Sequence, residues 1–362
     1  MGYISVVQTV KFPNKVSQSD LKEFASNLFS ESFKDTDRLL EVFDNTGISN
    51  RNLCVPVDFF SNDSSFHEKN NLFKKYALEY SVDAIDKILS DTNLDKSKLT
   101  DIISFTSTGL TTPSIDALII DKMHLNPNIN RTPLWGLGCA AGVSALAKAK
   151  TIADANPDAV ILLIGVELCS LTFIRNDLSK SNFIATSLFS DGVAAVLVTG
   201  ENSKQLIKNN HEIKITSSRS KLYYDSEDVM GLEFIDAGFK VVFSKDIPSL
   251  VNSLIKTDIK KYLEDNNLSI DELKNFVIHP GGTKVINAYV ESLSIPRDKL
   301  KNTIATLHEY GNMSSVTVLY VLEKFIKGGF EDGRGLMMSL GPGFSCEMLL
   351  LEMKNETVVT NK

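Results

Sequence analysis

A single cysteine, Cys139, lies in the small-residue segment 136–142, where its thiol could attack a carbonyl carbon. An apolar run at 133–135 precedes this segment, and residues 143–150, which have the composition of a helix, follow it. A thiol at such a strand-to-helix junction faces the unpaired N–H groups and the positive end of the helix dipole, which favour the thiolate and lower its pKa from about 8.5. A lone cysteine in a tight turn is more often a buried packing residue, so further residues are needed for a catalytic interpretation.

Two polar residues later in the chain provide that support. His279 comes between the apolar residues 276–278 and a Pro-Gly-Gly sequence, and Asn312 follows a glycine in residues 308–315. We expect each of them at the end of an apolar strand. Taken singly, the histidine could belong to a turn and the asparagine could cap a helix. Together with Cys139 they supply a thiol, an imidazole and a carboxamide, and the catalytic interpretation depends on this set.

The composition is that of a globular protein with a large core. The chain has 362 residues, 43% of them hydrophobic, which is enough for two domains or two fused halves. Its net charge of −7, without a basic stripe, argues against a nucleic-acid partner. We read no signal peptide at the N-terminus and no apolar run that could span a bilayer. Four scattered cysteines without CxxC spacing suggest neither zinc nor disulfides, so we expect a cytoplasmic protein.

The chain contains an internal repeat. Residues 84–105 have the pattern of a helix, a turn and a buried strand, and residues 258–279 have the same pattern. Leu94 and Leu268, at the ends of the two helices, are 174 positions apart. The alternation of helices and strands in both copies predicts α/β layers with mixed sheets.

The repeat also relates the candidate catalytic residues. The turns that hold Cys139 and Asn312 are 173 positions apart and each precedes a helical segment. We therefore divide the chain into an N-terminal half, residues 1–209, which carries the cysteine, and a C-terminal half, residues 210–362, which carries His279 and Asn312. A pseudo-twofold axis between the halves could bring the three residues together.

These segments resemble the thiolase superfamily and, within it, the chalcone synthase-like enzymes, or type III polyketide synthases. The resemblance covers nearly the whole chain and implies a five-layered αβαβα fold, a homodimer and a catalytic triad of Cys139, His279 and Asn312. The matching segments, in chain order, are 138–142, 187–192, 279–282, 309–315 and 341–343.

The resemblance assigns a role to each triad residue. Cys139 would take the acyl group from a starter acyl-CoA thioester, with His279 as its partner. His279 and Asn312 would then stabilise the negative charge on the thioester oxygen while malonyl-CoA loses CO₂. The enolate formed in this way would attack the acyl group on Cys139. The substrates are CoA thioesters, and the mechanism implies neither a metal nor another cofactor.

The resemblance also indicates a substrate cavity. Phe189 matches a gatekeeper phenylalanine, and Val241 matches a second gatekeeper, although a slip of two residues would place Phe243 there. Each of these positions is also plausible for an ordinary core or turn residue. The other cavity positions carried over are Ser107, Thr172, Leu232 and Ser314.

The residues that would bind CoA match the family less well. Of three basic positions in one helix only Arg38 is basic here, because Glu41 and Asn45 occupy the other two. Gly282 and Lys284 are the further CoA contacts we assign. CoA therefore either binds by another route, or the donor is an acyl carrier protein.

The starter is inferred from likeness alone. Residues 167–173 and 180–182 resemble bacterial members that use fatty acyl-CoA, so we expect a medium- or long-chain starter, two or three malonyl extensions, and cyclisation to an alkylpyrone or alkylresorcinol. A malonyl-primed tetrahydroxynaphthalene synthase is an alternative that a thiol at the Ser107 position would have favoured. A ketoacyl-ACP synthase that initiates fatty-acid synthesis is another, although residues 279–282 and 311–315 count against it. A non-catalytic acyl-binding protein of the same fold would not need the triad.

Overall fold

The computed structural model describes residues 1–29, 36–244 and 247–356, without the side chains of residues 36–39. The strands are β1 (Gly2–Thr9), β2 (Asn14–Ser17), β3 (Asn50–Leu53), β4 (Asp101–Thr106), β5 (Asn130–Trp135), β6 (Val160–Leu168), β7 (Asp191–Thr199), β8 (His211–Leu222), β9 (Met230–Ile235), β10 (Gly238–Phe243), β11 (Leu273–Ile278), β12 (Gly333–Gly341) and β13 (Ser345–Asn355). The helices are α1 (Gln18–Phe29), α2 (Thr36–Asp44), α3 (Phe66–Thr92), α4 (Ile115–Met123), α5 (Ala141–Ala155), α6 (Lys180–Leu188), α7 (Ile247–Leu250), α8 (Lys256–Asp265), α9 (Thr283–Leu293), α10 (Lys301–Tyr310) and α11 (Thr317–Gly328).

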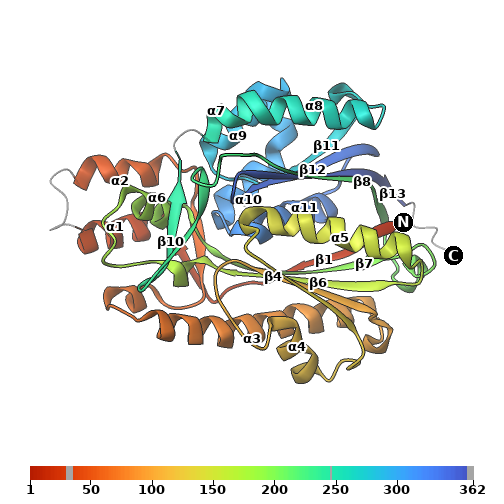
Figure 1. The fold of residues 1–362 in the computed structure, drawn as a ribbon, viewed down its shortest axis with the longest axis horizontal. Helices are drawn as coiled ribbons and strands as arrows, with labels where there is room; N and C mark the ends of the chain where they lie inside the picture. Colours follow the sequence, from red (N-terminus) through yellow and green to blue (C-terminus); the bar gives the residue numbers. More distant parts are fainter. Residues whose placement is uncertain (30–35, 245–246, 357–362) are drawn as a thin grey trace.

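The elements form five layers, as expected from the sequence. Figure 1 shows α3 and α4 outside one set of strands, α5 and α11 in the middle, and α8 and α9 outside the other set. Each of these strands contributes side chains to two cores, because successive side chains of a strand point to opposite faces of the sheet. In β6, Leu162 packs toward α3 and Leu163 toward α5. In β13, Leu349 packs toward the central helices and Leu350 toward α8 and α9.

The large sheet is mixed and includes strands from both halves of the chain. Its order is β11-β12-β13-β8-β1-β7-β6-β4-β5, with β4 parallel to β5 and β6, and β11 parallel to β12. The two halves join where β1 pairs with β8 at Gly2 and Tyr3. Residues 201–210, the polar segment at our division of the chain, lie between β7 and β8. Because the sheet continues from one half to the other, their strand ends are held in a common frame.

The predicted repeat is present, with one correction. Both copies form a helix, a short 3₁₀ turn and a buried strand: α3 and β4 in the first half, α8 and β11 in the second. The expectation of an apolar strand before Asn312 was wrong, because α10 occupies that place. Its buried residues are Thr303, Thr306 and Leu307. The last two follow Thr303 by three and four positions, which is the spacing of one helix face.

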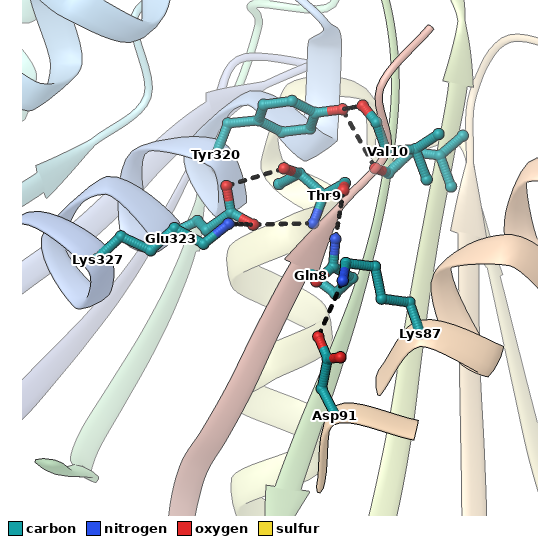
Figure 2. Close-up of polar contacts among 9 residues, drawn as sticks. Gln8, Thr9, Val10, Lys87, Asp91, Tyr320, Glu323 and Lys327 are labelled. Atoms are coloured by element: carbon teal, nitrogen blue, oxygen red, sulfur yellow. Dashed lines mark hydrogen bonds and ion pairs between the residues drawn. The ribbon is translucent and has the colours of Figure 1, made fainter. Parts of the chain in front are cut away.

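Helix α11, which begins just after Asn312, is tied to the end of β1 by polar contacts (Figure 2). Glu323 accepts hydrogen bonds from the Thr9 backbone N–H (3.0 Å) and the Thr9 hydroxyl (2.8 Å). The Tyr320 hydroxyl is within hydrogen-bonding distance of the carbonyls of Val10 (3.1 Å) and Val193 (3.2 Å). These bonds satisfy polar groups that are buried between the layers, and they fix the helix whose N-terminus borders the candidate site.

Candidate active site

Cys139 lies in a short 3₁₀ turn, Gly138–Ala140, between β5 and α5, as the sequence predicted. Gly138 has φ +46°, and a Cβ there would lie 2.5 Å from the Pro342 ring, so both the backbone and the packing require glycine. The Gly138 N–H donates to the Ser107 hydroxyl at 2.9 Å. The turn is therefore held by a β4 neighbour on one side and by the 341–343 segment on the other, and it presents a half-buried thiol.

His279 directly follows β11, and its backbone N–H donates to the Met338 carbonyl of β12 (3.0 Å). Its side chain is only 4% exposed. Neither ring nitrogen has a hydrogen-bond partner among the described residues. Buried polar groups are normally paired, so an unpaired imidazole indicates a group reserved for a ligand or a reacting atom.

Asn312 is 2% exposed and is fixed through both its backbone and its side chain. Its backbone N–H donates to the Leu188 carbonyl (2.9 Å), and its carbonyl accepts from Ser190 (2.9 Å). The side-chain oxygen accepts from the Ser314 N–H (2.9 Å), and Nδ2 donates to the Gly281 carbonyl (3.3 Å). Among residues 1–29, 36–244 and 247–356, Nδ2 makes this one hydrogen bond, so its second N–H is available for a substrate oxygen.

A chain of contacts joins the three candidates. Cys139 Sγ lies 3.7 Å from Ser314 Oγ, and Ser314 is bonded through its backbone to Asn312. Asn312 in turn reaches Gly281, two residues after His279. The structure therefore brings the predicted cysteine, histidine and asparagine segments from both halves of the chain to one place.

The electrostatics differ from the sequence-based expectation. Burial raises the pKa of the Cys139 thiol to about 12, and the Glu167 charge adds to this, while the contact with Ser314 opposes it. Burial also lowers the pKa of the His279 imidazole to about 3. The expected lowering of the thiol pKa by the helix was wrong, because desolvation outweighs the dipole. The two shifts favour the neutral form of each group, the thiol and the imidazole.

Glu167, at the end of β6, is a site residue that we did not identify from the sequence. Its carboxylate is fully buried and accepts from the Ser107 N–H (3.1 Å), the Thr108 hydroxyl (3.0 Å) and the Ser315 hydroxyl. Burial raises the pKa of Glu167 to about 7. The carboxylate thus connects the loop behind Cys139 with the loop after Asn312. An acidic residue in an otherwise apolar strand was the available signal.

A pocket lies beside the site and is lined by three of the predicted cavity residues, Phe189, Thr172 and Val241; Phe189 connects it to the site through a β-bridge with Asn312. The ring of Phe243, the alternative second gatekeeper, stacks on Phe189 with 5.7 Å between ring centroids. Most of the remaining wall is apolar, while Arg51 donates to the carbonyls of Phe189 (3.0 Å) and Thr186 from behind the gate position. The lining residues are Leu21, Phe24, Arg51, Leu53, Phe60, Cys169, Ser170, Thr172, Phe173, Asn182, Ala185, Thr186, Phe189 and Val241.

The other predicted cavity residues lie elsewhere in the site. Ser107 supports the Cys139 turn, and Ser314 contacts the thiol itself. Leu232 is not in the lining of this cavity, although it pairs with Val241 across the β9–β10 hairpin. Directly opposed residues of an antiparallel pair share a face, so Leu232 lies beside Val241 but outside the lining.

The predicted CoA contacts lie near the start of α9. Gly282 precedes the helix with φ +155°, and Lys284 is exposed in its first turn. Thr283 donates to the Thr46 carbonyl at 2.5 Å, which ties α9 to the loop after α2. Arg38 belongs to α2, but its side chain lies outside the described residues.

Neither a membrane span nor a metal cluster is found in the described part of the chain. None of its helices is both long enough and apolar enough to cross a bilayer. The same residues contain no group of three or more His, Cys, Asp and Glu side chains that could hold a metal ion.

Comparison with known proteins identifies the family. The N-terminal domain of chalcone and stilbene synthases matches residues 56–202, and their C-terminal domain matches residues 214–354. A Bacillus subtilis protein named for chalcone synthase is 42% identical over 97% of this chain and 98% of its own length. A tetrahydroxynaphthalene synthase of Streptomyces peucetius is 30% identical, covering 96% and 92%. The alpha-pyrone synthesis polyketide synthase-like Pks18 of Mycobacterium tuberculosis is 29% identical, covering 93% and 88%.

The fold agrees with solved structures. The tetrahydroxynaphthalene synthase of Streptomyces coelicolor superposes with a TM-score of 0.91 at 24% identity, covering 99% of this chain and all of that one. This likeness confirms the expected thiolase fold. Taken with the sequence matches to both domains, it means that this chain belongs to the chalcone and stilbene synthase family, the type III polyketide synthases, which are decarboxylating condensing acyltransferases.

Proposed function

We propose that this enzyme condenses a medium- or long-chain fatty acyl-CoA starter with two or three malonyl-CoA units and cyclises the product to an alkylpyrone or alkylresorcinol. The observation that carries the proposal is the contact chain from Cys139 through Ser314 and Asn312 to the segment of His279, next to a largely apolar cavity.

The first step is acyl transfer to Cys139. The thiol proton passes to a ring nitrogen of His279, and the sulfur attacks the thioester carbonyl of the starter. The C–S bond to CoA breaks, and the leaving thiolate takes the proton back from the imidazolium. The pKa shifts agree with a proton that is transferred during the attack, because burial disfavours both the thiolate and the imidazolium.

The second step is decarboxylative condensation. The carboxylate of malonyl-CoA leaves as CO₂, and the electron pair of the broken C–C bond moves into an enolate whose oxygen becomes negative. The free N–H of Asn312 and the single ring N–H of a neutral His279 can both donate to this oxygen. The enolate carbon then attacks the acyl carbonyl, and the Cys139 sulfur leaves as thiolate.

The cavity wall supports a fatty starter. Leu21, Phe24, Leu53 and Phe60 form an apolar side, and each buried CH₂ of a chain placed there contributes about 0.8 kcal/mol. The likeness to Pks18, which is named for alpha-pyrone synthesis, agrees with this choice.

A malonyl-primed tetrahydroxynaphthalene synthase is the second candidate. It is favoured by the 30% identity to an enzyme of that name. However, a malonyl-derived chain carries a carbonyl on alternate carbons, and the apolar side of the cavity offers few donors for these oxygens.

We also propose a homodimer and CoA-thioester donors, with Arg38, Gly282 and Lys284 near the CoA phosphates and an acyl carrier protein as the alternative donor. The dimer is supported by exposed apolar side chains at the end of β5, one of the two edge strands of the large sheet. Trp135 is 45% exposed, and Leu110, which follows the glycine whose carbonyl accepts from the Trp135 indole, is 40% exposed. Exposed apolar side chains that lie together are suited to contact with a second copy.

The test is mass spectrometry of products made from malonyl-CoA with hexanoyl-, dodecanoyl- and octadecanoyl-CoA. We expect pyrones or resorcinols whose mass follows the starter, and none from Cys139→Ala. Tetrahydroxynaphthalene from malonyl-CoA alone would support the second candidate. A single condensation that requires a carrier protein would contradict the proposal and favour the fatty-acid-type alternative.

A further inference from the structure

Lys69, in the first turn of α3, is a buried cation outside the catalytic machinery. Lys69 is only 6% exposed. Its Nζ donates to the carbonyl of Phe173 (2.9 Å) and to the carbonyl of Ala237 (3.3 Å). Burial lowers the pKa of Lys69, whereas the Asp63 charge opposes this effect. Burying an ammonium group costs desolvation free energy, which the two hydrogen bonds to carbonyl groups offset in part.

The two carbonyls belong to two walls of the same cavity. Phe173 follows the short 3₁₀ helix Cys169–Thr172, and both Phe173 and Thr172 line the cavity. Ala237 is in the tip of the β9–β10 hairpin, whose strand β10 contributes Val241. Lys69 thus joins a wall built from the N-terminal half to a wall built from the C-terminal half.

The hairpin needs such a connection because β9 and β10 form a two-stranded sheet of their own. Its base is attached where the Gly343 N–H donates to the Met230 carbonyl at 3.2 Å. Near the tip, Phe239 packs edge-on against Phe66, with 5.3 Å between centroids. A two-stranded hairpin is marginal without outside contacts, so the position of its tip depends on α3.

We propose that Lys69 is a positioning residue that sets the width of the cavity and thereby the range of acyl chain lengths that the enzyme accepts. The inference rests on the proposed function, in which this cavity holds the starter chain. Lys69 touches no reacting atom in the site; it acts through Val241 and Phe173. A methionine could fill much of the same space without the desolvation cost. The role of the ammonium group is therefore to hold the two cavity walls in place through its two hydrogen bonds.

The experiment compares Lys69→Met and Lys69→Arg with the control Lys74→Met, which removes an exposed lysine from the same helix. Loading of Cys139 by hexanoyl-, dodecanoyl- and octadecanoyl-CoA is followed by intact-protein mass. In Lys69→Met we expect the ratio between the fastest and slowest starter to fall by about tenfold, the size expected for a lost hydrogen bond to a charged group. Lys69→Arg should restore most of the ratio, and the control should match the parent.

Amide hydrogen exchange of the peptide 230–243 measures how firmly Lys69 holds the β9–β10 hairpin, and it requires no catalytic reaction. Faster exchange there in Lys69→Met, but not in the control, is expected. Unchanged exchange would overturn the inference whatever the activity, as would an equal loss of loading for all three starters. If the parent enzyme loads acyl groups but makes neither pyrones nor resorcinols, the proposed function fails while the loading ratios still decide the role of Lys69.

Discussion

The burial of His279 and Glu167 leads to a measurable prediction about stability. His279 is buried without a hydrogen-bond partner among the described residues, and burial lowers its pKa from 6.5 to about 3. Glu167, in the same site, has its pKa raised from 4.5 to about 7 by burial. Replacing each by glutamine removes one titration while keeping a polar side chain of similar size.

The two groups act on stability with opposite signs. Below pH 6.5 the unfolded chain protonates His279 and the folded chain does not, so the stability present above pH 6.5 is lost as the pH falls toward 3. Between pH 6.5 and 4.5 this loss amounts to about 2 kcal/mol. Between pH 4.5 and 7 the folded chain keeps a proton on Glu167 that the unfolded chain has released, so stability is lost as the pH rises. From pH 4.5 to 6.5 this loss is also about 2 kcal/mol, and the two effects nearly cancel in the parent protein.

The assay is guanidinium unfolding at pH 4.5 and pH 6.5, at one protein concentration because a dimer would make stability concentration-dependent. Relative to the parent, the unfolding free energy of His279→Gln should fall by about 2 kcal/mol as the pH increases between these values. That of Glu167→Gln should rise by about 2 kcal/mol over the same interval. The double variant should again follow the parent.

The sign of the His279→Gln difference is the decisive result. If the resting site held a thiolate–imidazolium pair, as the helix dipole alone would suggest, the pKa of His279 would lie above 6.5. The difference between variant and parent would then be absent or reversed in this interval. Such a result would refute the conclusion that desolvation controls the protonation of His279.

Three further predictions concern catalysis, packing and specificity. Asn312→Ala should slow malonyl-CoA decarboxylation by a factor of about 10²–10³, as expected for the loss of an oxyanion donor, and should slow the acylation of Cys139 much less. Decarboxylation is measured by CO₂ release and acylation by intact-protein mass. Equal losses in the two rates would argue against the role assigned to Asn312. Gly142→Ala would place a Cβ 2.4 Å from the Ser315 carbonyl, so we expect an unfolding free energy lower by about 1–3 kcal/mol, and an unchanged melting curve would contradict this contact. Val241→Phe should reduce dodecanoyl loading about tenfold more than hexanoyl loading in competition assays, whereas uniform loading would place Val241 outside the chain path.

Local pattern was sufficient for much of the fold. The strands before Cys139 and His279, the helix after Cys139 and the repeated helix–turn–strand unit follow from local sequence pattern, which depends only on neighbours along the chain. The segment before Asn312 was misread because a short run with apolar residues fits either a strand or a helix, and α10 is decided by which face packs on β3 and α11.

By itself, the sequence determined the identity of the three candidate side chains, their positions at turns beside regular elements, and the membership of the chain in a family. Only the tertiary structure decided that burial raises the pKa of Cys139 and lowers that of His279, that Glu167 connects the two loops of the site, and that Lys69 joins two cavity walls. The reason is physical. A periodicity is a local property, whereas desolvation and hydrogen bonding depend on which distant segments surround a group, and these are set only when the five layers pack together.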